Sequence, residues 1–162
     1  MLADDLLAEL ASAVRKAGGL VTVITDPAEP PPLPADVVVA STGASSAFHE
    51  TALDGLLRRA GRTDLLLAGW GLEGPVHSTM REANDRGYEC LLVPDACTSL
   101  DAALVEPACS MVRHSGGIFG AFAPARAVLA ALVGPASGPA PTPVVSPSLE
   151  AGVSGASQRS TP

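Results

Sequence analysis

The amino-acid sequence predicts an α/β protein whose mostly parallel sheet is doubly wound, with helices on both faces. The stretch from Asp64 to Asp95 carries the clearest evidence, because a leucine run, a glycine turn, a helical apolar stripe and a second apolar run follow one another. Elsewhere short apolar runs also alternate with helical segments, an order that favours parallel strands joined by crossover helices. Hydrophobic residues make up 47% of the chain and aromatic residues 3%, so we expect Ala, Leu and Val to fill the core.

The first third of the chain predicts two helices and two strands. Apolar residues recur every four positions over residues 2–17, where acids come early and bases late, as a helix prefers. The β-branched run LVTVIT at 20–25 and the valines at 37–39 are typical of strands. After the small-residue loop STGASS at 41–46, leucines predict a helix over residues 51–60.

The central segment predicts a strand, a tight turn, a helix and a second strand. The leucines at 65–67 form a buried strand that ends at the glycine turn 69–71. Pro75 opens the helix, because proline is tolerated in a first helical turn. Gly87 ends this helix with a left-handed cap, and residues 88–93 return as the next strand.

The last part of the domain predicts a loop, a helix, a short strand and a final helix. The loop covers residues 94–99, and Ser99 or Thr98 caps the helix that follows over 100–113. That helix is expected to bend near Pro107. A short strand at 118–121 and a helix that starts near Pro124 and ends near Val133 complete the predicted order.

The domain is predicted to cover residues 1–133, and residues 134–162 are predicted to be a disordered tail. The tail consists mainly of Pro, Ser, Gly, Ala and Thr, and it contains few large apolar side chains that could offset the entropy of ordering it.

Charge and cysteine usage narrow the classes of function. A net charge of −7 argues against nucleic acid or an anionic membrane surface as a partner. No apolar run has the length of a membrane span, and the acidic start MLADDLLAEL lacks the basic region of a secretory signal. Three cysteines without metal-ligand spacing suit a reducing compartment, so the sequence predicts a cytoplasmic protein.

Three segments carry a resemblance to a known family. The run GWGLEGPVHSTMREANDRGYECLLVPDAC, preceded by SSAFHETALDGLL and followed by SGGIFGAF, resembles the isochorismatase-like cysteine hydrolases. It is most similar to the amidohydrolase branch with the biuret and ureidoacrylate hydrolases, and the likeness covers roughly residues 5–133. The resemblance implies a Rossmann-like three-layer fold, and hydrolysis of amide or related bonds by an Asp–Lys–Cys triad.

The three triad positions that the resemblance implies are not filled here. The family's cysteine starts the helix after the glycine turn, where this chain has Pro75, and the family's lysine lies near Ser41 and Thr42. The family's aspartate ends a central strand that precedes the first helix, and this sequence starts at that helix. Either the recorded start lies downstream of the true one, or the sheet closes the gap by direct pairing or a borrowed strand. We therefore expect an isochorismatase-like protein that is catalytically inactive.

The residues expected around a substrate pocket lie at the carboxyl edge of the predicted sheet. They are Ser41, Thr42, Phe48, Trp70, Gly71, Glu73, Pro75 and His77. Glu73 either reaches the pocket or complements the helix dipole, and His77 is expected to be a pocket wall or surface residue rather than a catalytic one. Cys97 is expected to be inert rather than nucleophilic.

The sequence predicts no metal site and no cofactor. The three histidines are scattered, and the loop STGASS lacks the GK[ST] ending of a phosphate-binding loop.

Three functional hypotheses follow. The first is a non-hydrolytic member of the family that serves as a homo-oligomer or as the partner of an active relative. The second is an active hydrolase with rearranged or partner-supplied catalytic residues, with Cys97 as one candidate. The third is a module that binds a small amide or carbonyl compound.

Overall fold

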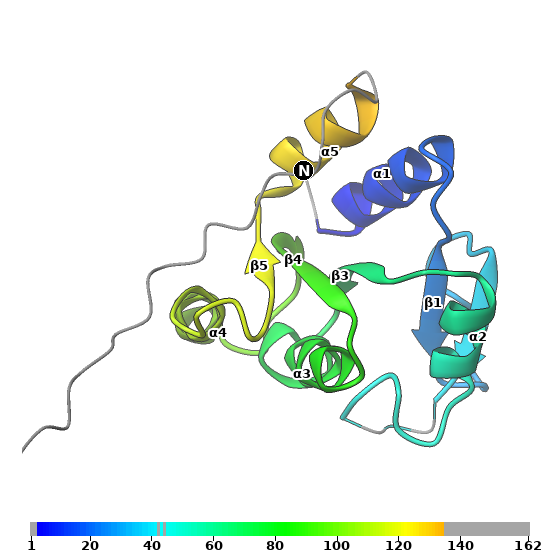
Figure 1. Ribbon diagram of the computed structural model, residues 1–162, viewed down its shortest axis with the longest axis horizontal. Helices are drawn as coiled ribbons and strands as arrows, with labels where there is room; N and C mark the ends of the chain where they lie inside the picture. The colour runs from blue at the N-terminus through cyan, green and yellow to red at the C-terminus, as the bar shows by residue number, and fades with distance from the viewer. Residues whose placement is uncertain (1–2, 42, 44, 135–162) are drawn as a thin grey trace, which may run out of the picture.

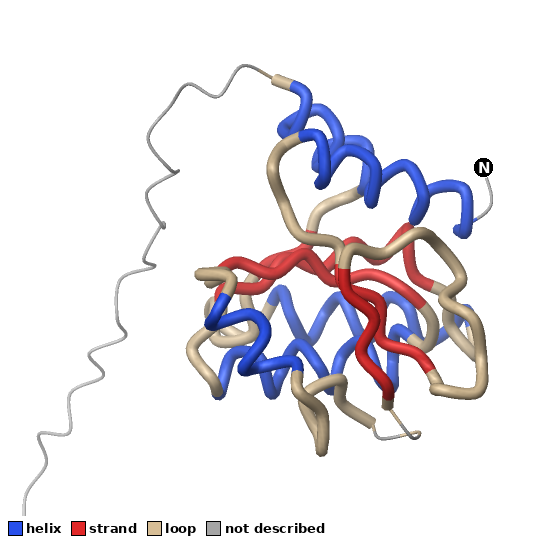
Figure 2. Tube along the Cα trace, turned by 90° about the vertical axis from the view of Figure 1, so that its right-hand side faces the viewer, coloured by secondary structure: helices blue, strands red, loops and turns tan. Residues whose placement is uncertain are grey.

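The protein has three layers, with strands between two layers of helices (Figure 2). The computed structural model describes residues 3–41, 43 and 45–134, and the predicted tail from residue 135 onward lies outside this range. One face of the strands carries α1 (Ala3–Lys16) and α5 (Ala125–Val133). The opposite face carries α2 (Leu53–Arg59), α3 (His77–Asp85) and α4 (Val105–Arg113).

The strands form two separate parallel sheets (Figure 1). The smaller sheet pairs β1 (Thr22–Thr25) with β2 (Val37–Ala40). The larger sheet has the order β3 (Asp64–Gly69), β4 (Glu89–Cys97) and β5 (Ala121–Phe122). The predicted parallel α/β architecture is confirmed. Among the described residues, β1 and β3 do not pair with each other, so the sheet does not close by direct pairing.

Several elements agree with the sequence pattern closely. Helix α1 begins and ends within one residue of its predicted bounds, with Asp4 and Asp5 in its first turn and basic residues in its last. Gly87 has a φ of +84°, the left-handed backbone expected of a glycine that follows a helix. These features depend on local sequence, which is why a periodic pattern could locate them.

Strand β4 is longer than predicted, and the expected loop at 94–99 is therefore wrong in its first part. The ladder with β3 shifts its register between Leu67 and Gly69, and pairing resumes where Gly69 meets Cys97. Pro94 falls within this irregular part of the ladder, where a residue without an N–H is tolerated. The proline therefore marks a bulge in the strand and not its end.

The segment after β4 also differs from the prediction. A short 3₁₀ turn, η2 (Ala102–Leu104), precedes α4, and Pro107 lies in the first turn of α4 rather than at a bend. The cap is Asp101, whose carboxylate accepts a hydrogen bond from the N–H of Ala103 at 2.9 Å. Strand β5 covers only Ala121–Phe122, and Ile118, predicted to start a strand, is an exposed turn residue.

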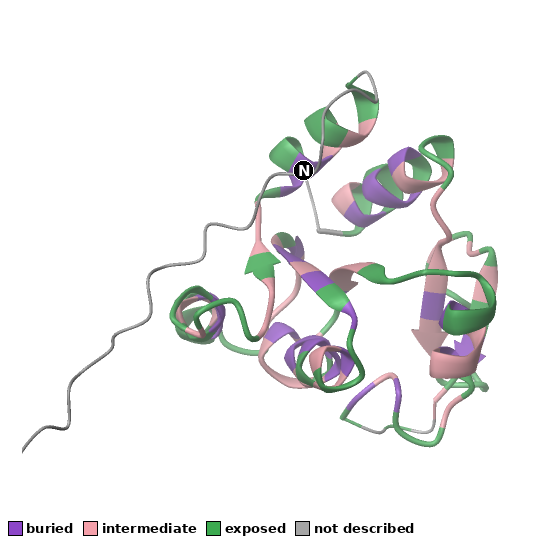
Figure 3. Ribbon diagram, viewed as in Figure 1, coloured by how far each residue is buried: buried purple, intermediate pink, exposed green. Residues whose placement is uncertain are grey.

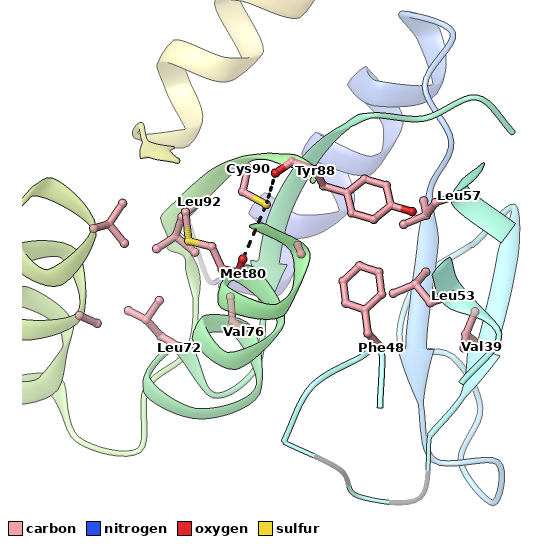
Figure 4. Packing of buried hydrophobic residues seen from close by; sticks show 13 residues of the cluster. Val39, Phe48, Leu53, Leu57, Leu72, Val76, Met80, Tyr88, Cys90 and Leu92 are labelled. Carbon is pink, nitrogen blue, oxygen red and sulfur yellow. Dashed lines mark hydrogen bonds between the residues drawn. The ribbon is translucent and has the colours of Figure 1, made fainter. Parts of the chain in front are cut away.

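Two hydrophobic clusters fill the spaces between the layers, and buried residues line the inner faces of the helices (Figure 3). The larger cluster lies under α2, α3 and α4, and Leu72, Met80 and Leu92 are completely buried there. Figure 4 shows Phe48 and Tyr88 in this cluster, with ring centroids 5.7 Å apart. The smaller cluster packs α1 and α5 against the other face of β3 and β4.

Helices and loops join the two sheets even though the strands do not. The Tyr88 hydroxyl donates a 2.8 Å hydrogen bond to the carboxylate of Asp54 in α2. On the same side, the Ala47 N–H donates to the Thr79 hydroxyl of α3 at 2.9 Å. At the amino ends of β1 and β3, Arg62 donates to the carbonyl oxygen of Gly18 at 3.0 Å. The sheets are thus held in one body by contacts above, below and at one edge.

The helices in the described part of the chain are short or carry several charges, and none of them combines the length and apolar composition that a membrane crossing requires.

Replacing Leu92 with alanine should destabilise the domain strongly. Leu92 is 0% exposed in β4, so the change leaves a cavity, and large-to-small core changes of this kind cost about 2–5 kcal/mol. Denaturant unfolding followed by circular dichroism measures the loss. Leu100→Ala is the matched control, because Leu100 is 94% exposed and its truncation should leave the unfolding free energy nearly unchanged.

Candidate functional site

The candidate site is built on the turn that follows β3. The turn residues 69–71 lead into η1 (Leu72–Val76), a π-helical turn, which continues directly into α3. Gly71 has a φ of +77°, and a Cβ at this position would lie 2.8 Å from Cδ of Pro75. Glycine is therefore required twice, by the backbone angle and by the proline ring packed against it.

Pro75 lies inside η1 and does not open α3 as the sequence suggested. The N–H of Val76 reaches back five residues to the carbonyl oxygen of Gly71 at 3.2 Å, which closes the wider turn. Because proline has no N–H to donate, a turn closed by its neighbour accommodates it. The Pro75 side chain is exposed, so it stands at the surface of this turn without offering a nucleophile or a hydrogen-bond donor.

Glu73 connects this turn to the segment after β4. Its carboxylate accepts hydrogen bonds from the Ser99 hydroxyl at 2.8 Å and from the N–H of Leu100 at 2.7 Å. Hydrogen bonds from its own backbone N–H and from Ser99 lower the pKa of Glu73, so it is ionised at neutral pH. Glu73 therefore fixes a loop in place, in addition to its position near the start of a helix.

His77 is buried beneath the helix start and is only 4% exposed. Its Nδ1 accepts a hydrogen bond from Nε of Arg81 at 3.1 Å, and Nε2 is buried with no hydrogen-bond partner among the described residues. Burial, and then the charge of Arg81, lower the pKa of His77, so the ring is neutral at pH 7. The ring meets Phe119 edge to face at a centroid distance of 6.2 Å, a packing role in the wall of the helix layer.

The other predicted pocket residues are divided between the surface and the core. Trp70 is 45% exposed in the turn itself, whereas Phe48 is 4% exposed and packs in the larger hydrophobic cluster. Ser41 follows β2 in the other sheet, where its N–H donates to the carbonyl oxygen of Thr25. Thr42 lies outside the described residues. The structure thus groups Trp70 and the segment that follows it, but it does not bring Phe48 to the same surface.

None of the three thiols lies on the turn or on η1. Cys90 and Cys109 are buried, and Cys97 lies beside Gly69 in the ladder. The Cys97 thiol donates to the carbonyl oxygen of Val93 at 3.3 Å, and burial raises its pKa to about 11. Burial also raises the pKa of Cys90 to about 11 and that of Cys109 above its ordinary value. All three are therefore protonated at neutral pH and poor nucleophiles.

Within the described residues, no group of three or more His, Cys, Asp or Glu side chains is arranged to hold a metal ion.

Sequence reasoning missed three residues that organise this edge. Ser99 was considered only as a helix cap, whereas its hydroxyl joins Glu73 to the carbonyl oxygen of Asp101. Arg81 bonds His77 and lies 4.3 Å above the Phe119 ring. Asp95 accepts a hydrogen bond from the Ala125 N–H at the start of α5. The i, i+4 spacing of His77 and Arg81 was a usable signal for one of these contacts, but the other two join residues more than 20 positions apart.

The reactivity of the native thiols should depend steeply on pH. At pH 8 about one thousandth of a thiol with a pKa near 11 is ionised, so iodoacetamide should modify the folded chain slowly. The rate should rise about tenfold per pH unit toward pH 11 for as long as the fold survives, which circular dichroism monitors. Mass spectrometry of peptides from the treated chain assigns the rate to each cysteine, and rapid modification of Cys97 at pH 7 would contradict the burial argument.

Comparison with known proteins agrees with this geometry. The isochorismatase domain matches residues 4–122 of the chain. An isochorismatase family protein from Burkholderia thailandensis is 28% identical with a TM-score of 0.69, and the match covers 80% of this chain and 82% of that one. The nicotinamidase PncA from Bacillus subtilis shares the fold at 21% identity and a TM-score of 0.63, over 75% of this chain and 84% of the other. The chain therefore belongs to the isochorismatase family and has the fold of its hydrolases.

Proposed function

We propose that this chain is a member of the isochorismatase family that does not hydrolyse amides by the family's cysteine mechanism. The observation that carries the proposal is Pro75 in η1, at the position where the family resemblance expects the nucleophilic cysteine. Proline there removes two groups at once, since it has neither a side-chain nucleophile nor a backbone N–H that can stabilise a developing oxyanion.

The positions for the other two triad members support the same proposal. Ser41, next to the position expected for lysine, offers a hydroxyl, which cannot supply the positive charge of an ammonium group. The first described element is α1, and none of the described strands occupies the position before it, where the resemblance expects the aspartate. Amide hydrolysis needs a nucleophile, a proton carrier and charge stabilisation together, and triad members act as a unit.

The alternative in which Cys97 replaces the missing nucleophile has little support. Its thiol hydrogen bonds to Val93 and has a pKa of about 11, whereas a catalytic thiol needs a pKa lowered by a positive charge or a helix end. Within the family, the segment REANDRGYECL and the acid Glu73 favour a position near the biuret and ureidoacrylate hydrolases. This branch assignment is part of the proposal, and a small amide remains the class of compound to test as a ligand.

The purified chain should not hydrolyse biuret, ureidoacrylate or nicotinamide. Ammonia release at pH 8 is the measurement, with the chain at micromolar concentration and the Bacillus subtilis nicotinamidase as the positive control for nicotinamide. We expect rates equal to a protein-free blank, because no activated nucleophile is present. Turnover that exceeds the blank and disappears on changing one residue of this chain, for example Cys97→Ala, would refute the proposal.

Changing Pro75→Cys should restore an accessible thiol without restoring hydrolysis. The side chain at position 75 is exposed, so the new thiol should react with iodoacetamide faster than the three native cysteines. Pro75→Ser is the matched control, with the same backbone change and no thiol. General acid–base assistance is typically worth about 100- to 10,000-fold, so the thiol alone should remain inactive. An amide turnover of about 1 per second or more would mean that other residues supply the missing functions.

A further inference from the structure

The division of the sheet leaves two strand edges without partners. In a parallel ladder, alternate residues direct both their N–H and C=O groups to the same edge of the strand. In β1 the carbonyl groups of Val21 and Thr25 accept hydrogen bonds from Val37 and Ser41, on the β2 side. The N–H and C=O groups of Thr22 and Ile24 therefore point to the opposite edge, where no strand pairs with them among the described residues.

The same reasoning identifies the free groups of β3. The carbonyl oxygen of Thr63 accepts from the N–H of Glu89, so residues 63 and 65 direct their backbone groups to β4. Asp64 and Leu66 direct theirs away from β4, to an edge that also has no partner in the described chain. Strand edges of this kind are templates for pairing with another extended segment.

The surroundings of these edges are those of a sheet interior. Leu65 and Leu67 pack toward the larger cluster, whereas Leu66 and Ala68 pack toward the smaller one, so apolar layers lie on both faces of β3. All four side chains are nevertheless only half-buried, although an aliphatic run of this kind is typical of a fully buried strand. Contacts between α2 and the α3–β4 segment, and the bond from Arg62 to Gly18, already hold the two sheets together.

We propose that β1 and β3 together accept an extended strand of about five residues from a different polypeptide, a length typical of strands. Such a strand would donate and accept hydrogen bonds on both of its edges, so its central residues cannot be proline. Its side chains would face the two apolar clusters alternately, so the recognised segment is aliphatic on both faces. A second copy of this chain is the weaker occupant, because the β-branched runs among its described residues already lie in β1 and β2.

A synthetic peptide tests this proposal directly. The probe is fluorescein-labelled Lys-Val-Thr-Val-Ile-Val-Thr-Lys with blocked ends, and its control is the same peptide with N-methyl groups on alternate residues, which keeps the side chains and removes strand pairing. We expect saturable one-to-one binding by fluorescence anisotropy, and affinity for the methylated peptide that is weaker by about tenfold or more. Equal binding of the two peptides, or no saturation at millimolar concentration, would overturn the proposal.

Amide hydrogen exchange followed by NMR identifies the edges used. On binding, the N–H groups of Thr22, Ile24 and Leu66 should become protected, whereas Val23 and Leu65 should change little because their N–H groups face β2 and β4. Ile24→Pro removes one N–H from the free edge and leaves the β1–β2 ladder intact, so it should weaken peptide binding with the circular dichroism spectrum retained. Protection of Thr22 and Leu66 in a self-associated sample without peptide would instead identify a second copy as the occupant, and would overturn the assignment to a different polypeptide.

Discussion

The parallel ladder between β3 and β4 is the interaction on which the candidate site depends. After the register shift, Thr98 donates to the carbonyl oxygen of Gly69, and Leu72 donates to that of Thr98. These two bonds connect the end of β3, the glycine turn and the start of η1 to the segment that follows β4. Glu73 adds side-chain bonds to the next two residues of that segment. The turn is therefore held by main-chain bonds that are independent of the residue at position 75.

This independence explains how a hydrolase fold can persist without its chemistry. Pro75 fits a π-helical turn that Val76 closes, and its ring packs against a position where only glycine avoids a clash. The architecture of the turn and the reactivity of the turn thus rest on different groups. A substitution can remove the nucleophile and an N–H donor while the helix, the ladder and the hydrophobic clusters remain satisfied.

The sequence was most informative where structure depends on neighbours along the chain. The spacing of apolar residues located α1, and Gly87 marked a helix end, because both effects act within one or two helical turns. Pro94 was misread as a loop, since the bulge that accommodates it arises from register with another strand. Phe48 was assigned to a pocket and lies in the core, because its neighbour Tyr88 is 40 positions away in the sequence. The partners of Glu73 could not be read locally for the same reason.

The two-sheet arrangement also has a consequence for cooperativity. The β1–β2 pair has only four residues in each strand, and a pair of that size is marginal by itself. Its ties to the larger sheet are side-chain bonds such as Tyr88 to Asp54, together with the Phe48 contact, and not a continuous ladder. Opening of this pair with α2 would leave the β3–β4–β5 sheet and its flanking helices α3, α4 and α5 paired and packed. The chain is therefore built from two unfolding units of unequal free energy, with the smaller one as the first to open.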